Sequence, residues 1–415
     1  MKISVKTSLL KALLDKVSKG ADEQGLQHIS TCVSIEVKEG NLILRTTNRT
    51  HLLKITEPNL FEKDIEFYAC VPNQLFWKLV SKMSVATLTL EVTEKALNVK
   101  GNGDYAIPLS FDVDGTVCRI NDIPFEEYEE VKNDAGEIVS KQPVTPTAFE
   151  LTAAQMKDVL NYNSASAQRV TAVAGTVIGY FVDKNGFITY DSTACMNNLT
   201  LSDVKTFMPN KMMELCEVFT GEKIRFDLLP TVIRVTCGND ELTYKLQDAS
   251  LAENYPAEVI RGLAENEFTG SCKANKVDLI DALDRLALFV KIGPVQVVAR
   301  VRLIFEAGKL TLFDPYGKNI EIIKTADGEG DQSFTQEIDL VYLRSLLSCH
   351  EGDNLKLSFG NDVGIMITDK NIIQLIPYLE EDPSLSGDTS SAPAEEEASF
   401  AAIAVQDDET DEVEG

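Results

Sequence analysis

The side chains that most often carry out catalysis are few and scattered in this chain. Its three histidines lie in unrelated contexts, and its eight cysteines occur singly, without CxxC or other metal-ligand spacing. The stretch FDVDG at Phe111 has two spaced carboxylates, but no second carboxylate cluster accompanies it. P-loop, GxSxG and zinc motifs are absent. We therefore predict no catalytic residue, no metal and no cofactor, and the chain is not expected to be an enzyme.

The isolated cysteines are typical of reduced, buried thiols in a cytosolic protein. No run approaches the roughly 18 apolar residues that a membrane span needs. The chain opens with MKISVKTSLL, which has the alternation of a strand and lacks the apolar core of a signal peptide. These features predict a cytoplasmic protein with no membrane partner.

The net charge of −26 is unevenly distributed along the 415 residues. Residues 380–415 hold thirteen acids and no Lys or Arg, which is half of that charge. This segment is also rich in Ser, Pro and Ala and has few large apolar side chains. It cannot bury enough surface to offset its ordering entropy, so we predict a disordered acidic tail at 383–415.

One pattern of residues occurs three times. GNLILRTTN begins at Gly40, GFITYDST at Gly186 and GKLTLFDP at Gly308, which are 146 and 122 residues apart. Each is followed at similar distance by a second pattern, from Leu88, Ile224 and Leu355. A period of this length indicates tandem homologous domains rather than a solenoid. We place three domains at 1–143, 147–262 and 266–382, with a first linker in KQPVTPTAF.

Helical spacing of apolar residues predicts two helices in each repeat. They lie near Thr7–Gly20, Pro72–Met83, Thr152–Arg169, Asn210–Thr220, Lys273–Lys291 and Asp339–Ser348. The remaining patterns are strands, so each domain is expected to be an α+β unit whose two helices pack on one side of an antiparallel sheet.

These six segments are basic although the chain is acidic. They hold thirteen bases and eight acids, whereas the rest of the chain holds 26 bases and 57 acids. Salt-bridged helix faces would explain any single lysine. The asymmetry across all six segments indicates a cationic surface that meets phosphate, on a protein that otherwise repels nucleic acid.

Five segments follow one another along the chain: MKISVKTSLLKALLDKVS, RINDIPFEEYEEV, AENYPAEVI, SCKANKVDLIDALDRLALF and NIIQLIPYL. With these segments, in this order, the chain resembles the bacterial DNA polymerase III beta subunit, the nucleoid-associated sliding clamp, over about residues 1–380. The resemblance implies a half-ring of three DNA-clamp domains that closes as a head-to-tail homodimer around double-stranded DNA. The ring would bind without sequence preference and hold the replicative polymerase, after a clamp loader has opened it.

The resemblance also implies two kinds of site. The channel-facing, DNA-binding candidates are Lys11, Lys19, Lys78, Lys82, Lys157, Arg169, Lys211, Lys273, Lys276, Arg285 and Arg344. The partner-peptide pocket would lie between the second and third domains, at Cys195, Met196, Val259, Ile260, Leu375, Ile376, Pro377 and Tyr378. The loop that starts at Gly20 carries Asp22 and Glu23 and no arginine, which weakens the expected DNA contacts.

Three readings of the tail stay open. Its apolar island, Phe400, Ile403 and Val405, is expected to visit the pocket and compete with partner peptides. Alternatively, the tail tethers a basic partner, or it only increases solubility. For the whole chain, the alternative to a processivity clamp is a clamp-fold interaction scaffold or decoy that no longer encircles DNA. A nuclease or polymerase is disfavoured because no carboxylate constellation is present. Three repeats favour a dimer over a trimer.

Overall fold

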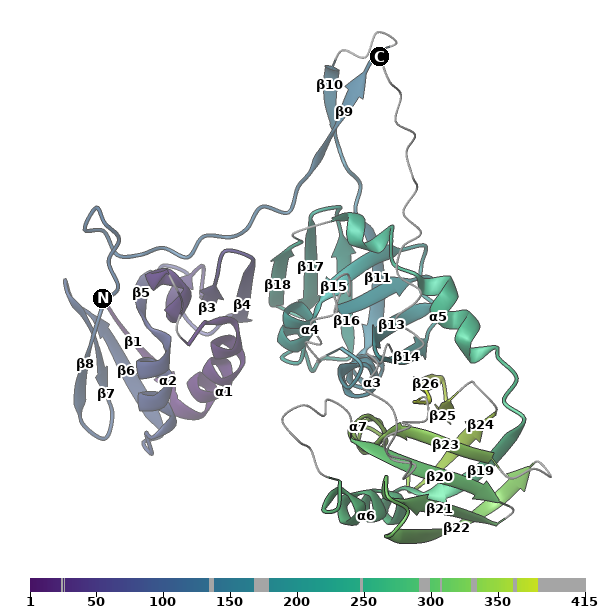
Figure 1. The fold of residues 1–415 in the computed structure, drawn as a ribbon. Helices are drawn as coiled ribbons and strands as arrows, with labels where there is room; N and C mark the ends of the chain where they lie inside the picture. Colours follow the sequence, from purple (N-terminus) through teal and green to yellow (C-terminus); the bar gives the residue numbers. More distant parts are fainter. Residues whose placement is uncertain are drawn as a thin grey trace, which may run out of the picture. The chain divides into compact units, whose positions relative to one another are not determined.

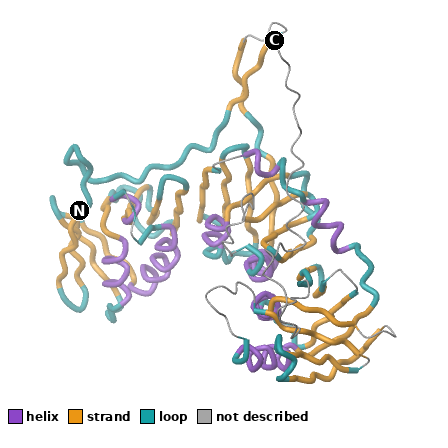
Figure 2. The backbone as a smooth tube through the Cα atoms, viewed as in Figure 1, coloured by secondary structure: helices purple, strands orange, loops and turns teal. Residues whose placement is uncertain are grey.

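The structure is a computed structural model in which strands outnumber helices (Figures 1 and 2). It describes residues 1–23, 25, 27–133, 138–167, 179–246, 249–290, 299–306, 308–329, 334–360 and 364–379. The acidic tail with its apolar island, and Arg169, lie outside these residues. The chain separates into two compact units, residues 1–157 with 201–250 and residues 158–200 with 251–415. The division into three domains remains a prediction.

The first unit is built on two larger antiparallel sheets. The four-stranded sheet has the order β1 (Lys2–Lys6), β6 (Thr87–Val92), β7 (Ala96–Lys100) and β8 (Asp104–Pro108). The eight-stranded sheet has the order β11 (Thr147–Thr152), β16 (Lys223–Leu228), β17 (Val232–Cys237), β18 (Asp240–Lys245), β4 (His51–Glu57), β3 (Asn41–Thr47), β2 (Cys32–Lys38) and β5 (Phe67–Pro72). Because β18 pairs with β4, strands from the first and second repeats share one sheet.

Helices cover part of this eight-stranded sheet. Helix α1 (Thr7–Val17) contacts β3 and β4, and α2 (Asn73–Ser81) contacts β2 and β5. Leu10, Leu14 and Phe76 are fully buried beneath them, as the helical spacing predicts. Helix α4 (Asn210–Cys216) follows β15 (Lys205–Pro209) and contacts β18. The exposed sides of α1 and α2 are thereby fixed side by side.

The second unit is a long antiparallel sheet. Its order is β12 (Gly179–Asp183), β13 (Gly186–Asp191), β14 (Thr193–Asn198), β26 (Ile372–Ile376), β25 (Ile365–Asp369), β24 (Asn354–Phe359), β19 (Gly270–Asn275), β22 (Ile320–Glu329), β21 (Lys309–Phe313), β20 (Arg300–Glu306) and β23 (Phe334–Asp339). The pairing of β14 with β26 joins the second repeat to the third. Helix α6 (Lys276–Ala287) contacts β19 and β22, while α7 (Leu340–Ser348) contacts β23 and β26. Helix α3 (Ala153–Ser164) spans the boundary of the two units in sequence.

The repeated glycine of the first pattern has a conformational role. Gly40, Gly186 and Gly308 all have positive φ, at 82°, 116° and 78°. At Gly186 an added Cβ would stand 2.1 Å from the carbonyl oxygen of Asn197, so only glycine fits there. The second pattern forms a three-stranded meander in each repeat, where the sequence predicted a strand pair.

Two elements differ from the sequence-based expectation. A hairpin of β9 (Tyr128–Lys132) and β10 (Ile138–Pro143) forms a separate two-stranded sheet, and β10 and β11 include much of the expected linker. All residues of β10 are exposed, so the alternating burial that usually marks a strand is missing. Helix α5 (Ala257–Ala264) occupies the expected connection to the third repeat. No helix in the described residues is long and apolar enough to cross a membrane.

His51 lies at the junction of β4 and β18, where it is fully buried. Its Nε2 donates to the carbonyl oxygen of Gly20 at 2.9 Å, and its ring stacks on Tyr244. Burial lowers the pKa of His51 from its ordinary value, although the bond to Gly20 opposes that change. The folded state therefore takes up this proton less readily than the unfolded state.

We expect the first unit to lose stability as the pH falls below about 6.5, the ordinary histidine pKa. Above that pH the full contribution is present, because His51 is neutral in both states. His51→Gln retains a donor for Gly20 and cannot titrate. Its unfolding free energy, measured in urea at pH 7.5 and pH 5, should change less than that of the wild type. Equal pH dependence of the two proteins would exclude His51 as the cause.

Candidate nucleic-acid interface and partner pocket

The α1–α2 surface, defined as the exposed side chains of these two helices with Lys19 and Lys82, carries several lysines. The side chains of Lys78 and Lys82 are exposed and form no ion pair or hydrogen bond within the described residues. The two helices are held together because Trp77 Nε1 donates to Asp15 Oδ1 at 2.6 Å. Both lysines are thus displayed on a rigid pair of helices, free to meet an external anion.

The other predicted cations of the first unit are partly engaged. Lys11 is half-buried and donates to the carbonyl oxygen of Met83 at 2.8 Å. Lys19 follows α1 in a 3-10 turn and pairs with Glu217 at 3.0 Å. Lys211 lies 3.8 Å from Glu214 on the same helix, and Lys157 is exposed on α3. Each could still present charge to a ligand, because such exposed pairs are weak.

In the second unit the predicted cations are paired more strongly. Arg285 donates through two nitrogens to Glu321, at 2.7 and 2.8 Å, and lowers the pKa of that carboxyl. Arg344 binds Asp284 in the same two-pronged way and joins α7 to α6. Lys273 lies on β19, outside the helix predicted to contain it, and pairs with Asp327 at 2.7 Å. The charge of these groups becomes available to an external anion only when the carboxylate is displaced.

Lys276 is directed inward at the start of α6. Its Nζ donates to the carbonyl oxygen of His350, and the residue is half-buried. The helix itself is capped by Asn275, whose side chain accepts from the backbone N–H groups of Val277 and Asp278. Lys276 thus joins the beginning of α6 to the end of α7, which is a structural role that its sequence position did not reveal.

The actual helix bounds reduce the charge asymmetry. Helices α1, α2, α3, α4, α6 and α7 contain eight bases and six acids, because Lys19, Lys82 and Lys273 fall outside them and Arg169 and Lys291 lie outside the described residues. The excess lies in α1 and α2, which hold three bases and one acid, whereas α6 and α7 hold three of each. Positive charge on the helices is therefore concentrated in the first repeat.

The structure brings together most of the predicted partner pocket within the second unit. Cys195 and Met196 lie on β14, and Leu375 and Ile376 lie on β26, which is hydrogen-bonded to β14. All four are buried, and burial raises the pKa of the Cys195 thiol. These four residues form the buried floor of the predicted pocket, which means that they lie beneath its surface and a peptide could not contact them.

The accessible part of this region comes from α5 and the segment after β26. Helix α5 contacts β26, and it buries Ile260 while leaving Val259 45% exposed. Pro377 and Tyr378 are half-buried beyond the end of β26. Arg261 anchors α5 by donating to Asp183 and to Glu258, both at 2.8 Å. Val259, Pro377 and Tyr378 are thus the residues that a partner could contact.

A buried polar network supports this floor, and sequence reasoning missed it. His350, at 2% exposure, lies with Nδ1 3.2 Å from Asp369 and Nε2 2.8 Å from Gln374. Tyr162 donates to the same carboxylate, and burial followed by the charge of Asp369 raises the pKa of Tyr162. The amide of Gln374 in turn donates to the carbonyl oxygen of Tyr162. Tyr162 comes from α3, His350 from just after α7, and Asp369 and Gln374 from the neighbouring strands β25 and β26, so no local pattern indicates the network.

The described residues offer no group of three or more His, Cys, Asp or Glu that could hold a metal ion. Seven of the eight cysteines are buried, and Cys349 is half-buried. Cys32, for example, donates through its Sγ to the carbonyl oxygen of His28 and lies within hydrogen-bonding distance of the Ser110 hydroxyl. The exposed lysines of the α1–α2 surface can bind an anion by charge, and Val259 offers an apolar contact.

The fold is similar to solved structures across nearly its whole length. The Bacillus subtilis DNA polymerase sliding clamp matches with TM-score 0.72 and 18% identity, over 92% of this chain and 99% of that one. The beta subunit of the Streptococcus pyogenes DNA polymerase matches with TM-score 0.73 and 16% identity, over 91% and 100%. The Thermotoga maritima DNA polymerase III beta subunit matches with TM-score 0.71 and 16% identity, over 91% and 99%.

The sequence itself matches no protein-family model, and no curated protein is a significant match. The likeness is therefore one of fold: α+β, with antiparallel sheets and few helices, as expected from the sequence.

Proposed function

We propose that this chain, which has the fold of the DNA polymerase III beta subunit, is a divergent member of that family and works as a sliding clamp. It would encircle duplex DNA as a head-to-tail homodimer and tether the replicative polymerase after loading by a clamp loader. Its role would be non-catalytic. The observation that carries the proposal is the match of 91–92% of this chain to nearly complete clamp structures.

The charge distribution supports contact with phosphate but no base recognition. Lys78 and Lys82 are exposed on the α1–α2 surface of an acidic protein. Lysine holds a phosphate as a mobile point charge, without the bidentate geometry of arginine. Contacts of this kind bind DNA without sequence preference and allow movement along it.

Exposed apolar side chains support association of two copies. In the first unit Tyr105, on the edge strand β8, is 42% exposed. In the second unit Leu288, Ile320 and Ile322 are 81%, 54% and 64% exposed. Two different surfaces of this kind suit a head-to-tail contact, which forms a ring when its rotation closes.

Tyr105→Glu is expected to shift the protein toward monomer, because a carboxylate would be buried at the proposed contact. Sedimentation velocity at micromolar concentration measures this shift. Val113→Glu is the matched control, since Val113 is fully exposed in the loop that follows β8. A wild-type protein that sediments as a monomer at all concentrations would contradict the proposed dimer, and equal effects of both variants would contradict the role of Tyr105.

The functional test is topological. A loaded ring should stay on circular duplex DNA through a high-salt wash and leave after the DNA is linearised. Loss from both forms at the same rate would contradict encirclement. The test requires the clamp loader of the same organism, and a known clamp carried through the same loading reaction serves as the positive control.

A second candidate function is an interaction scaffold that does not encircle DNA. The ion pairs of Arg285, Arg344 and Lys273 favour it, because they occupy cations that would otherwise face DNA. Exposed pairs of this type contribute only about 0–1 kcal/mol, so phosphate can displace the carboxylate at little cost. For this reason we prefer the clamp, and the topological test separates the two functions.

Partner binding should depend on the accessible part of the pocket region. Val259→Glu is expected to weaken binding of the replicative polymerase about tenfold or more, since a charge would meet an apolar contact. Surface plasmon resonance with the immobilised chain measures the affinity in the absence of DNA. Val341→Glu is the control, because Val341 is 40% exposed on α7 and outside the region. Equal loss in both variants would remove support for this pocket.

A further inference from the structure

Both ring nitrogens of His350 face hydrogen-bond acceptors. The residue lies just after α7 and is 2% exposed. Its Nδ1 is 3.2 Å from a carboxylate oxygen of Asp369, and its Nε2 is 2.8 Å from the side-chain oxygen of Gln374. A neutral imidazole has one N–H donor and one acceptor nitrogen. Two acceptor partners therefore match a ring that carries a proton on each nitrogen.

The orientation of the Gln374 amide is set by its second contact. Its Nε2 donates to the carbonyl oxygen of Tyr162 at 3.3 Å. If the amide were turned by half a rotation, its oxygen would face that carbonyl oxygen, and two buried acceptors would meet without a proton between them. The oxygen of Gln374 therefore faces His350, and Nε2 of His350 is a donor.

The other ring nitrogen meets the carboxylate of Asp369. The hydroxyl of Tyr162 donates to the same oxygen, Oδ2, at 3.3 Å. With Nε2 protonated, an unprotonated Nδ1 would direct its lone pair at the carboxylate. A proton between the two groups removes this repulsion, and it belongs to the ring because imidazole is a stronger base than carboxylate. The result is an imidazolium–carboxylate pair inside the second unit.

Other titratable groups surround this pair. They are Lys276 of α6, Asp158 and Tyr162 of α3, Cys195 of β14, Lys370 beside Asp369, and Cys349 and Glu351 on either side of His350. Lys276 bonds through Nζ to the carbonyl oxygen of His350 and not to its ring. Asp369 is the charged group that contacts the ring, and its negative sign favours the imidazolium.

The pair joins strands that carry the floor of the proposed partner pocket. Asp369 lies on β25, and Gln374 lies on β26 opposite Cys195 of β14. The last residues of β26, which belong to the floor, follow Gln374 directly. A change at the ring of His350 is therefore passed to β26 through Gln374.

We propose that His350 is a doubly protonated positioning residue, whose buried ion pair with Asp369 holds Gln374 and thereby fixes β26 in the floor of the partner pocket. The link to a pocket rests on the proposed function, whereas the charge of the ring does not. The proposal assigns a role to a buried histidine that neither DNA contact nor partner contact uses directly.

The charge of the ring is tested by ¹⁵N NMR of the histidines in the full chain at pH 7.5, where an exposed histidine is mostly neutral. His350 is expected to show two protonated ring nitrogens, and His350→Gln assigns its signals. His51 is the internal reference and should show one, because its Nε2 bonds to Gly20 while its Nδ1 has no partner within the described residues. A single protonated nitrogen in His350 would overturn the proposal.

Asp369→Asn preserves the shape of the side chain and removes its charge. The new amide can donate to an unprotonated Nδ1, so His350 is expected to become neutral while the second unit stays folded. Backbone amides of residues 374–376 should then exchange with solvent about tenfold faster, as for the loss of a hydrogen bond to a charged group. Asp281→Asn, at an exposed position on α6, is the matched control and should change neither the ring signals nor the exchange.

The charge of the ring and its positioning role are tested separately. A doubly protonated His350 with unchanged exchange in Asp369→Asn would overturn the positioning role. Equal acceleration in Asp281→Asn would overturn it as well, since the effect would then follow net charge. Failure of polymerase binding or of retention on circular DNA contradicts the proposed function, and it alters neither the ring signals nor the exchange.

Discussion

Lys78→Glu combined with Lys82→Glu is expected to reduce the affinity for duplex DNA and to flatten its salt dependence. Each phosphate contact contributes about 0.9 to the slope of log affinity against log salt concentration. Loss of two contacts per chain should therefore lower the slope by about 1.8. The effect should be large because these lysines have no carboxylate partner within the described residues, and each substitution also adds a repelling charge.

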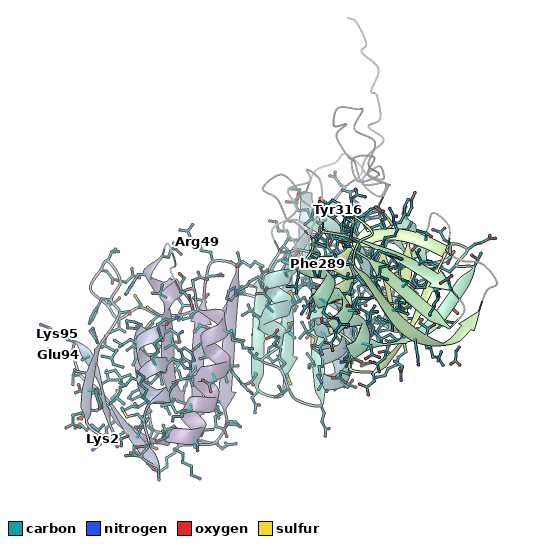
Figure 3. All side chains as sticks on the ribbon, turned by 60° about the horizontal axis from the view of Figure 1, so that its bottom comes forward. Lys2, Arg49, Glu94, Lys95, Phe289 and Tyr316 are labelled. Atoms are coloured by element: carbon teal, nitrogen blue, oxygen red, sulfur yellow. The ribbon has the colours of Figure 1, made fainter. Side chains whose placement is uncertain are left out.

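The control changes charge equally at a different surface. Lys2→Glu with Lys95→Glu alters β1 and the turn between β6 and β7, which Figure 3 shows on the four-stranded sheet. Fluorescence anisotropy with a duplex at several salt concentrations gives both slopes. If the control reduces the slope as much as the α1–α2 variant does, DNA binding follows net charge and not this surface.

Glu337→Leu is expected to destabilise the second unit by about 3–5 kcal/mol, as when one partner of a buried ion pair is removed. Glu337 lies on β23 and is 7% exposed. Its carboxylate pairs with the guanidinium groups of Arg302, at 2.6 Å, and of Arg300, at 3.4 Å. Arg300 is only 4% exposed, so the substitution leaves its charge buried without this carboxylate. Urea unfolding at neutral pH measures the loss.

Glu321→Leu provides the matched comparison. It removes a carboxylate from an exposed pair with Arg285 in the same unit, so it should cost no more than about 1 kcal/mol. Similar losses for both variants would show that burial does not govern these ion pairs.

The Glu337 variant also tests a connection to the proposed partner pocket. The carbonyl oxygen of Glu337 accepts from the backbone N–H of Leu379 at 2.7 Å, next to Pro377 and Tyr378. Disturbing β23 should therefore loosen the accessible edge of the pocket. Faster hydrogen exchange at Leu379 in Glu337→Leu than in Glu321→Leu would confirm this coupling.

Sequence reasoning succeeded where the pattern is local and periodic. The apolar spacing of Leu10, Leu14 and Phe76 correctly placed α1 and α2, and the repeated glycines marked turns that require positive φ. It failed where burial does not alternate. The β9–β10 hairpin has exposed residues throughout β10, and α5 follows a proline in a short segment that resembled a connection.

The candidate site was less predictable than the fold. The sequence around Arg285 or Arg344 does not indicate which carboxylate pairs with that arginine. The partners, Glu321 and Asp284, lie 36 and 60 positions away. The same holds for the network of Tyr162, His350 and Gln374 beneath the pocket floor, since its partners come from three separate segments. Which cations remain free is decided by side-chain packing, and the helical period does not encode it.

By itself, the sequence determined the α+β class, the three repeats and the concentration of acid outside the helices, because periodicity and composition act over short distances. The tertiary structure decided which charges are neutralised and which are displayed. It paired three of the predicted cations of the second unit, Lys273, Arg285 and Arg344, with acids 36 or more positions away, because only chain folding brings such distant side chains together. It left the side chains of Lys78 on α2 and of Lys82 directly after it open to an external anion.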